Sequence, residues 1–195
     1  MAPTLVAQPF HHPGWVYEEQ YDGWRVFAYK DNQSVRLVSR TGWDLSTRFP
    51  DLVSAVRTLP ARTLILDGEV CIFDERLVSR AELLGDPLSD EVAPSALFKV
   101  FDCLYARQRD LRHLPLESRR RWLEAEVQGE RILPARRLPD DGLEAWQEVL
   151  ARGYQGLLAK DPQSSYVGGR SIKWLKVKAP GRREGERGWG PILKT

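Results

Sequence analysis

The chain is predicted to fold as an α+β domain in which antiparallel sheets dominate. Short runs that alternate apolar and polar residues, a pattern typical of strands, outnumber the stretches with helical periodicity. Turn residues join several of these runs directly, as in hairpins, and helices intervene at irregular intervals. A doubly wound parallel sheet would instead alternate strands and helices regularly, so the sequence argues against that class.

The first half of the chain is predicted to be mostly strand. Residues 15–38 alternate as two strands around the turn pair Asp31-Asn32. Apolar residues at helical spacing follow over residues 49–56. Residues 63–73 then form an apolar run, which predicts a buried strand.

The second half is predicted to mix strands and helices. Residues 95–105 read as another strand. A helix is expected over residues 115–126, because proline at position 115 suits a first helical turn. A short amphipathic helix over residues 142–152 and strands over residues 156–160 and 172–178 complete the prediction.

The composition fits one domain with a short appendage. The 195 residues are 42% hydrophobic and 29% charged, enough for a substantial core. We expect a domain over residues 1–178 and a basic, glycine-rich tail over residues 179–195. The formal net charge of +2 permits a nucleic-acid partner without requiring one.

Cysteine and histidine usage predicts a reducing compartment and no metal centre. Cys71 and Cys103 each lie in an apolar run, where a reduced thiol packs as a small hydrophobe. His11, His12 and His113 lack the spacing of metal ligands. With no signal-peptide pattern and no long apolar run, we expect a cytoplasmic, nucleoid-associated protein with no membrane partner.

Six short motifs occur in a fixed order along the chain. They are YEEQYDGWR at residues 17–25, SRTG at 39–42, LDGEV at 66–70, VFDCLY at 100–105, QGLLAK at 155–160 and WLKVK at 174–178. Their order and spacing resemble the ATP-dependent DNA ligases. The linking segments RFPDL, PLESRRRWLE and SSYVGGRSIKWLKVK resemble the bacterial repair ligases of the end-joining type. The resemblance extends from about Trp15 to Lys178.

The resemblance implies a ligase-type nucleotidyltransferase domain, which is ATP-grasp-like, with two antiparallel sheets flanking a nucleotide cleft. ATP or AMP would be the nucleotide, and nicked or double-strand-broken DNA the partner. Ligases of this kind carry an OB-fold domain after the last motif. The residues after Lys178 are too few for a five-stranded barrel, so we expect no OB-fold in this chain; a separate chain or other repair proteins would have to supply it.

Position 20 departs from the family's KxDGxR motif. In that motif a lysine amine attacks the α-phosphate of the nucleotide and carries the nucleotidyl group. Gln20 stands in its place, and a carboxamide has no basic lone pair for such an attack. We therefore expect self-adenylation at position 20 to be impossible. Asp22, in the same motif, is assigned either a catalytic role or a role in a turn.

The remaining site residues are assigned by resemblance. Glu18 would face the adenine edge and Phe101 the adenine ring, whereas Arg40 and Glu69 would contact the ribose. The phosphates would be contacted by Arg25, Lys176 and Lys178, since guanidinium and ammonium groups neutralise phosphate oxygens. The alternatives are a core position for Phe101, a polar strand face for the two lysines and a turn for Asp67.

Basic residues near the C-terminus are predicted to contact DNA. They are Lys173, Arg182, Arg183 and Arg187. The run from Arg119 to Arg121 is expected instead on the solvated face of a helix.

Gln155 marks a second departure, at the glutamate of the family's EGxxxK motif. A carboxylate there would help to hold a divalent ion, and an amide oxygen binds hard cations less well, so Mg²⁺ binding should be weak. If the lysine and the glutamate face one another, losing one alone would leave an unpaired buried charge, at a cost of about 3–5 kcal/mol. Replacing both keeps the site neutral.

Two main functions remain open after these observations, and an RNA ligase or capping-type relative is a third alternative. The first is a binding protein for DNA repair, a pseudoenzyme that retains nucleotide and DNA contacts without charging itself. The second is a functional ligase, or an enzyme that seals pre-adenylated nicks, in which another lysine such as Lys160 or a partner chain replaces the missing nucleophile. Intact-mass analysis after incubation with ATP and magnesium separates the two.

Overall fold

The fold consists of two sheets joined through the strand-to-strand turn that follows residue 20. A computed structural model describes residues 1–86, 89 and 91–181. The smaller sheet has the strand order β1-β10-β9-β2. Its strands are β1 (Ala2–Leu5), β2 (Val16–Gln20), β9 (Gly156–Lys160) and β10 (Arg170–Lys178).

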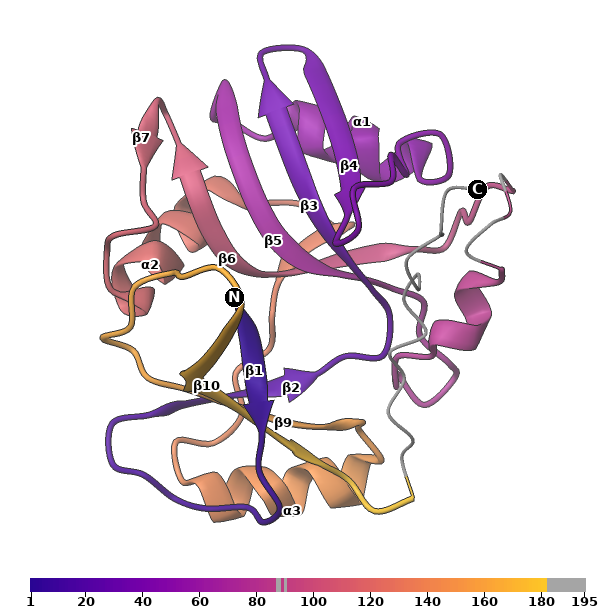
Figure 1. Ribbon diagram of the computed structural model, residues 1–195. Helices are drawn as coiled ribbons and strands as arrows, with labels where there is room; N and C mark the ends of the chain where they lie inside the picture. Colours follow the sequence, from indigo (N-terminus) through magenta and orange to yellow (C-terminus); the bar gives the residue numbers. More distant parts are fainter. Residues whose placement is uncertain (87–88, 90, 182–195) are drawn as a thin grey trace, which may run out of the picture.

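The larger sheet has six strands, in the order β4-β3-β5-β6-β7, and β8 pairs with β6. Its strands are β3 (Trp24–Asp31), β4 (Ser34–Ser39), β5 (Thr63–Cys71), β6 (Leu97–Ala106), β7 (Arg109–Asp110) and β8 (Ile132–Pro134). Figure 1 shows this sheet above the smaller one. The predicted α+β class with two sheets is confirmed.

Two details of the strand prediction are wrong. The segment predicted as two strands forms three, because the chain turns after Gln20 as well as at Asn32, whose φ is 53°. The sheets are also not wholly antiparallel, since β1 pairs with β10 and β8 with β6 in parallel. Both parallel pairs join segments that are distant in sequence or very short, so no local alternation pattern reveals them.

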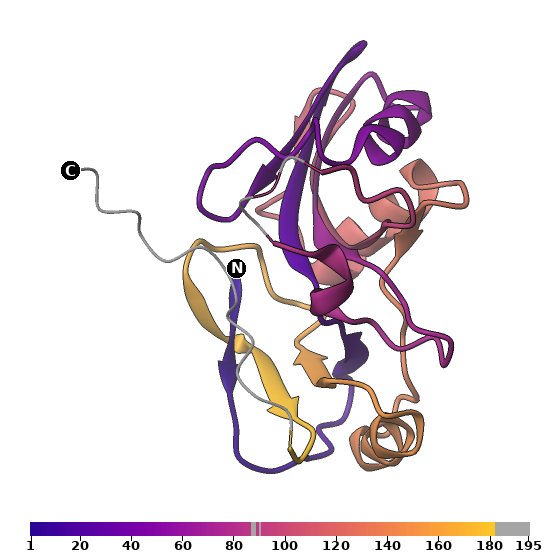
Figure 2. The same cartoon turned by 90° about the vertical axis from the view of Figure 1, so that its right-hand side faces the viewer.

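Helices form at the three places where the sequence predicted them, and a short 3₁₀ helix that was not predicted also forms. They are α1 (Pro50–Thr58), the short 3₁₀ helix η1 (Ala81–Leu84), α2 (Leu116–Glu126) and α3 (Gly142–Arg152). Asp141 caps α3 by accepting hydrogen bonds from the backbone N–H groups of Leu143 and Glu144, and Gly153 ends it at a φ of 73°. Figure 2 shows the three α-helices on one side of the strands.

The core lies between the larger sheet and the helices α1 and α2. Strand β3 buries Val26 and Ala28 fully in this core, whereas Phe27 and Tyr29 point to the opposite face. A second core packs α3 against the smaller sheet. A third joins residues of both sheets, including Phe101 and Trp174, and it lies beside the site described below.

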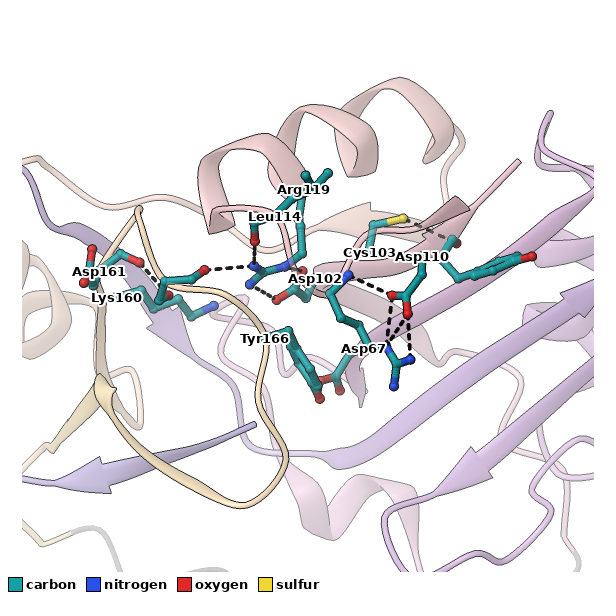
Figure 3. Close-up of polar contacts among 12 residues, drawn as sticks. Asp67, Asp102, Cys103, Asp110, Leu114, Arg119, Lys160, Asp161 and Tyr166 are labelled. Atoms are coloured by element: carbon teal, nitrogen blue, oxygen red, sulfur yellow. Dashed lines mark hydrogen bonds and ion pairs between the residues drawn. The ribbon is translucent and has the colours of Figure 1, made fainter. Parts of the chain in front are cut away.

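The solvated face predicted for Arg119 to Arg121 is wrong for two of the three arginines. Arg119 is fully buried and binds Asp102 on β6 through two hydrogen bonds of 2.7 and 2.8 Å. Its guanidinium also donates to the carbonyls of Leu114 and Ser164 (Figure 3). Arg120 is buried as well, and only Arg121 is exposed. The charges of α2 therefore fix the helix to the sheet and to the loop before β10.

No helix in the described part of the chain is long and apolar enough to span a membrane.

Candidate nucleotide site

A pocket opens between the two sheets, where the turn after β2 meets β9 and β10. Its lining comes from both sheets and brings together most of the residues predicted from the motifs. They are Pro3, Gln20, Tyr21, Asp22, Gly23, Arg25, Glu69, Phe101, Gln155, Leu158, Trp174, Lys176 and Lys178. Motifs that are up to about 160 positions apart in the sequence thus share one cavity.

Two glycines allow the strands to approach closely around this pocket. A Cβ on Gly23 would lie 2.2 Å from the carbonyl oxygen of Val70. A Cβ on Gly156 would lie 2.2 Å from the carbonyl oxygen of Val177 and 2.7 Å from Oε1 of Gln20. Gly156 therefore leaves the space that the side chain at position 20 occupies.

The two glutamines predicted to replace catalytic residues both line the pocket. Oε1 of Gln20 is buried and has no hydrogen-bond partner among the described residues. Nε2 of Gln155 donates a hydrogen bond of 2.6 Å to Oδ2 of Asp22. Asp22 also anchors its turn, because its backbone N–H donates to the hydroxyl of Ser79 at 2.8 Å. The amides thus stand beside one carboxylate and form no ion pair.

Cross-strand register explains how the two motif lysines reach the pocket. Gln20 and Lys178 both pair with Gly156 on β9, and Glu18 and Lys176 both pair with Leu158. Side chains that share a cross-strand row project from the same face of a sheet. Lys176 and Lys178 are therefore on the pocket side, although each sits two strands away from β2.

Glu18 projects from the same face of the smaller sheet, but it lies in a buried charged cluster and does not line the pocket. Its carboxylate is 2.5 Å from Nζ of Lys160 and 3.5 Å from Nη1 of Arg120. Lys160 is fully buried, and its amine lies 4.2 Å from the ring centroid of Trp174 and 5.0 Å from that of Phe101. The Lys160 amine thus packs against Phe101 and Trp174, the two aromatic residues that line the pocket.

Arg25 lines the pocket while it is held by Asp67. Its guanidinium donates to both carboxylate oxygens of Asp67, at 3.0 and 2.7 Å, and to the carbonyl of Met1 at 2.6 Å. Tyr166 donates a further hydrogen bond of 2.7 Å to Asp67 (Figure 3). The guanidinium carbon also lies 5.3 Å from the ring centroid of Phe101. Asp67 therefore acts through an ion pair and not through a turn.

Glu69 is the pocket carboxylate whose protonation the site alters most. Burial raises the pKa of Glu69 from its ordinary value to about 8, and Asp67 and Asp22 add to this, whereas Arg25 and Arg40 oppose it. Arg40, exposed at the end of β4, does not line the pocket but acts electrostatically on Glu69. The pocket therefore favours the protonated form of the Glu69 carboxyl group.

Phe101 serves the core and the pocket together. It is 8% exposed, packs edge-on against Trp174 at a centroid distance of 6.1 Å, and still lines the cavity. Lys173, predicted to contact DNA, is exposed and its amine lies 3.0 Å from Asp161. Arg182, Arg183 and Arg187 lie outside the described residues.

Sequence reasoning missed three contributors to the site. Trp174 supplies half of the aromatic wall, Tyr166 binds the Arg25–Asp67 pair, and Pro3 brings β1 to the rim. Trp174 begins the WLKVK motif and Tyr166 lies in the SSYVGGRSIK segment, so both stood within recognised motifs. Pro3 carried no signal, because β1 is short and pairs with the far end of the chain.

A divalent ion would find few anionic oxygens in this pocket. No group of three or more histidine, cysteine, aspartate or glutamate side chains suited to a metal occurs in residues 1–86, 89 and 91–181. Asp22 already accepts a hydrogen bond from Gln155, and burial raises the pKa of Glu69 to about 8. Such a donor set fits weak magnesium binding, since hard cations prefer ionised carboxylates.

A two-sheet α+β domain with a pocket between its sheets and these motifs on the pocket wall defines a nucleotidyltransferase fold. The chain belongs to the ATP-dependent DNA ligases, because a model of that family, described as "ATP dependent DNA ligase domain", matches residues 4–178.

Named relatives agree with this assignment. The chain is 32% identical over 184 residues to the multifunctional non-homologous end joining protein LigD of Pseudomonas aeruginosa, covering 93% of this chain and 22% of that protein. It is 36% identical over 177 residues to a probable DNA ligase of an Anaeromyxobacter species, covering 83% of this chain and 33% of that protein. The chain therefore spans about a fifth to a third of the length of these relatives.

Solved structures show the same fold. The crystal structure of the ligase domain of M. tuberculosis LigD superposes with a TM-score of 0.75 at 27% identity, covering 91% of this chain and 59% of that one. A mycobacterial DNA ligase D complexed with ATP and MES gives a TM-score of 0.72 at 27% identity, with 91% and 60% coverage. The fold prediction of a ligase-type domain is confirmed.

Proposed function

We propose that this chain serves DNA repair by binding ATP or AMP together with nicked or broken DNA, and that its ability to charge itself with AMP is impaired. The observation that carries the proposal is an amide at position 20, in the wall of the pocket, where the family motif has a lysine. An amide nitrogen has its lone pair delocalised into the carbonyl and forms no phosphoramide.

The second glutamine supports the same conclusion. Gln155 donates to Asp22, so Asp22 keeps an amide partner in place of a cation. A lysine at position 20 facing a glutamate at position 155 would form an ion pair, and losing either partner alone would strand a charge. The two amides leave the pocket neutral at these positions. A site that binds nucleotide without reacting fits this arrangement.

The remaining pocket groups suit a nucleotide in an unreactive mode. Phe101 offers a ring for the base, and Glu69 accepts or donates hydrogen bonds at the ribose according to pH. Lys176 and Lys178 line the pocket and would contact the phosphates, whereas Asp67 restrains Arg25. Glu18 can contact the edge of a base only if its carboxylate accepts hydrogen bonds from both Lys160 and the base. Arg40 acts on the ribose end through its charge near Glu69.

Magnesium would bind beside Gln155, Asp22 and Glu69, and when bound it would neutralise phosphate charge. Because Asp22 already accepts a hydrogen bond from Gln155 and burial raises the pKa of Glu69 to about 8, we expect that binding to be weak.

The alternative function is a working ligase in which another lysine or a partner chain replaces residue 20. Lys160 suits this role poorly, because its amine is buried and lies 2.5 Å from the Glu18 carboxylate, which occupies it. Lys176 and Lys178 line the pocket and are the better candidates. For either function, we further propose that the partners include other repair proteins or a separate OB-fold chain. We also propose a cytoplasmic, nucleoid-associated location.

Intact-mass analysis tests the proposal. The protein is incubated with ATP and magnesium, and its mass is compared with that of Gln20→Lys and of Gln20→Lys combined with Gln155→Glu. We expect no AMP adduct on the natural chain, little on the single variant and a measurable adduct on the double variant. A stable AMP adduct on the natural chain, mapped to any lysine, contradicts impaired self-adenylation.

A further inference from the structure

The face of the larger sheet that turns away from α1 and α2 carries apolar residues where a solvated sheet would carry polar ones. Strand β3 points Phe27 and Tyr29 to this face, and Tyr29 is 41% exposed although it lies within a strand that is paired on both sides. The upper part of the sheet in Figure 1 has α1 behind it, and its front is open. Exposed aromatic rings in the middle of a sheet mark a contact surface.

Strand register places two tyrosines in one row across this face. Arg36 on β4 pairs with Tyr29 on β3, Tyr29 pairs with Ile65 on β5, and Ile65 pairs with Tyr105 on β6. A depression of about 480 Å³ is lined by these four residues together with neighbours from the strand ends. Tyr29 and Tyr105 are separated by two strand spacings, about 10 Å, so unpaired bases fit between or upon their rings.

This face continues into the nucleotide pocket. Phe27 lies one strand repeat from Tyr29, and their ring centroids are 6.5 Å apart. The guanidinium carbon of Arg25, which lines the pocket, is 5.8 Å from the Phe27 centroid. A chain of nucleotides that leaves the pocket past Arg25 therefore meets Phe27 first and the tyrosine row next.

We propose that this aromatic face, defined by Phe27, Tyr29, Ile65 and Tyr105, binds the unpaired bases of a broken DNA end. Sheets with exposed aromatic residues bind single strands by stacking, with little sequence preference, because every base has a π-face. Arg36 stands at the outer edge of the row, 3.1 Å from Asp44 in an exposed ion pair. Such a pair is weak, so its guanidinium can turn to a phosphate.

DNA is favoured over a protein partner because the face leads directly from the nucleotide pocket of a DNA-ligase-family domain. The inference rests on the proposed function, which supplies the DNA partner. It adds which part of the DNA the protein recognises, namely a single-stranded overhang. It predicts tighter binding of an overhang than of a blunt end.

The test measures fluorescence anisotropy with three probes: a blunt duplex, the same duplex with a 3′ overhang of thymidines, and the overhang strand alone. Tyr29→Ala combined with Tyr105→Ala removes both rings, and Tyr29→Phe keeps a ring as the conservative control. Leu150→Ala on α3, which removes another exposed apolar side chain, is the control for general effects. Thermal unfolding and gel filtration accompany each variant.

We expect the double alanine variant to lose about fivefold to a hundredfold of overhang affinity, the range expected for lost stacking on aromatic rings, with blunt-duplex affinity unchanged. Tyr29→Phe and Leu150→Ala should bind like the natural chain. Equal losses on blunt and overhang probes, or no loss on either, overturn the inference. So does a natural dimer that the double variant converts to a monomer, because the face would then be a self-interface. If no probe binds the natural chain, the proposed function itself fails.

Discussion

Nε2 of Gln155 lies 2.6 Å from Oδ2 of Asp22, and this hydrogen bond joins the residue just before β9 to the turn after β2. An amide in this position binds the carboxylate without adding charge. The bond therefore holds this side of the pocket together without a lysine at position 20 and without a metal ion.

Gln155→Glu should make the folded protein depend on magnesium. The change places a second carboxylate against Asp22, and two like charges at this separation destabilise one another and raise the pKa of one of them. We expect a lower melting temperature without magnesium and recovery when it is added, since two carboxylates bind hard cations. Differential scanning fluorimetry with and without magnesium measures this. A variant as stable as the natural chain, with no response to magnesium, would show that the hydrogen bond has no such role.

The buried Arg119–Asp102 pair should dominate the stability of the α2 contact. Arg119→Ala leaves the Asp102 carboxylate buried without its partner, and we expect a loss of about 3–5 kcal/mol in the free energy of unfolding. Arg121→Ala, the exposed neighbour on the same helix, should change it by less than about 0.5 kcal/mol. Urea denaturation of both variants gives the comparison. Similar effects from the two substitutions would contradict the assignment of Arg119 to the core.

Stability should fall as pH rises through neutrality. Burial raises the pKa of Glu19 from its ordinary value of 4.5 to about 7, and Lys99 and Arg136 only partly oppose this. A raised carboxyl pKa contributes stability that is complete below about pH 4.5 and is lost as pH rises through about 7. Glu69 acts in the same direction. Glu19→Gln should therefore reduce the decline in unfolding free energy between pH 5 and 8, measured by urea titrations, and an unchanged slope would exclude this origin.

The sequence predicted the pocket because the motifs carry its chemistry. Gln20, Asp22, Glu69, Phe101 and the two motif lysines all reach one cavity. It could not predict that Glu18 would be bound by Lys160 and Arg120, because the partners come from β9 and α2 and only the folded chain brings them together. For the same reason, the sequence predicted that Arg119 to Arg121 would lie on a solvated helix face, because the buried partners of Arg119 and Arg120 come from other elements.

The parallel pairing of β1 escaped prediction on similar grounds. Its residues pair with the far end of the chain and show no alternation of their own. By contrast, the local amphipathic pattern of residues 142–152 predicted α3, and the structure shows the aspartate cap and terminal glycine at its ends.

DNA binding should be strongly dependent on salt. Lys173, Lys176 and Lys178 and the arginines of the tail would contact phosphates, and counterions released on binding make affinity fall with added salt. Lys176→Ala should weaken binding of all sequences alike and lower the slope of log affinity against log salt by about 1. Anisotropy titrations at several salt concentrations measure both. Affinity that is insensitive to salt, or to neutralising Lys176 and removing residues 179–195, would contradict the assignment.

Sealing of two matched nicks tests the central claim most directly. One nicked duplex carries a plain 5′ phosphate and the other a 5′ end already joined to AMP, so that only attack by the 3′ hydroxyl remains. Each is incubated with purified protein, ATP and either magnesium or manganese, and the product is resolved on a denaturing gel. We expect slow sealing of the pre-adenylated nick and none of the plain nick. Efficient sealing of the plain nick would contradict an account in which Gln20 and Gln155 prevent the protein from charging itself.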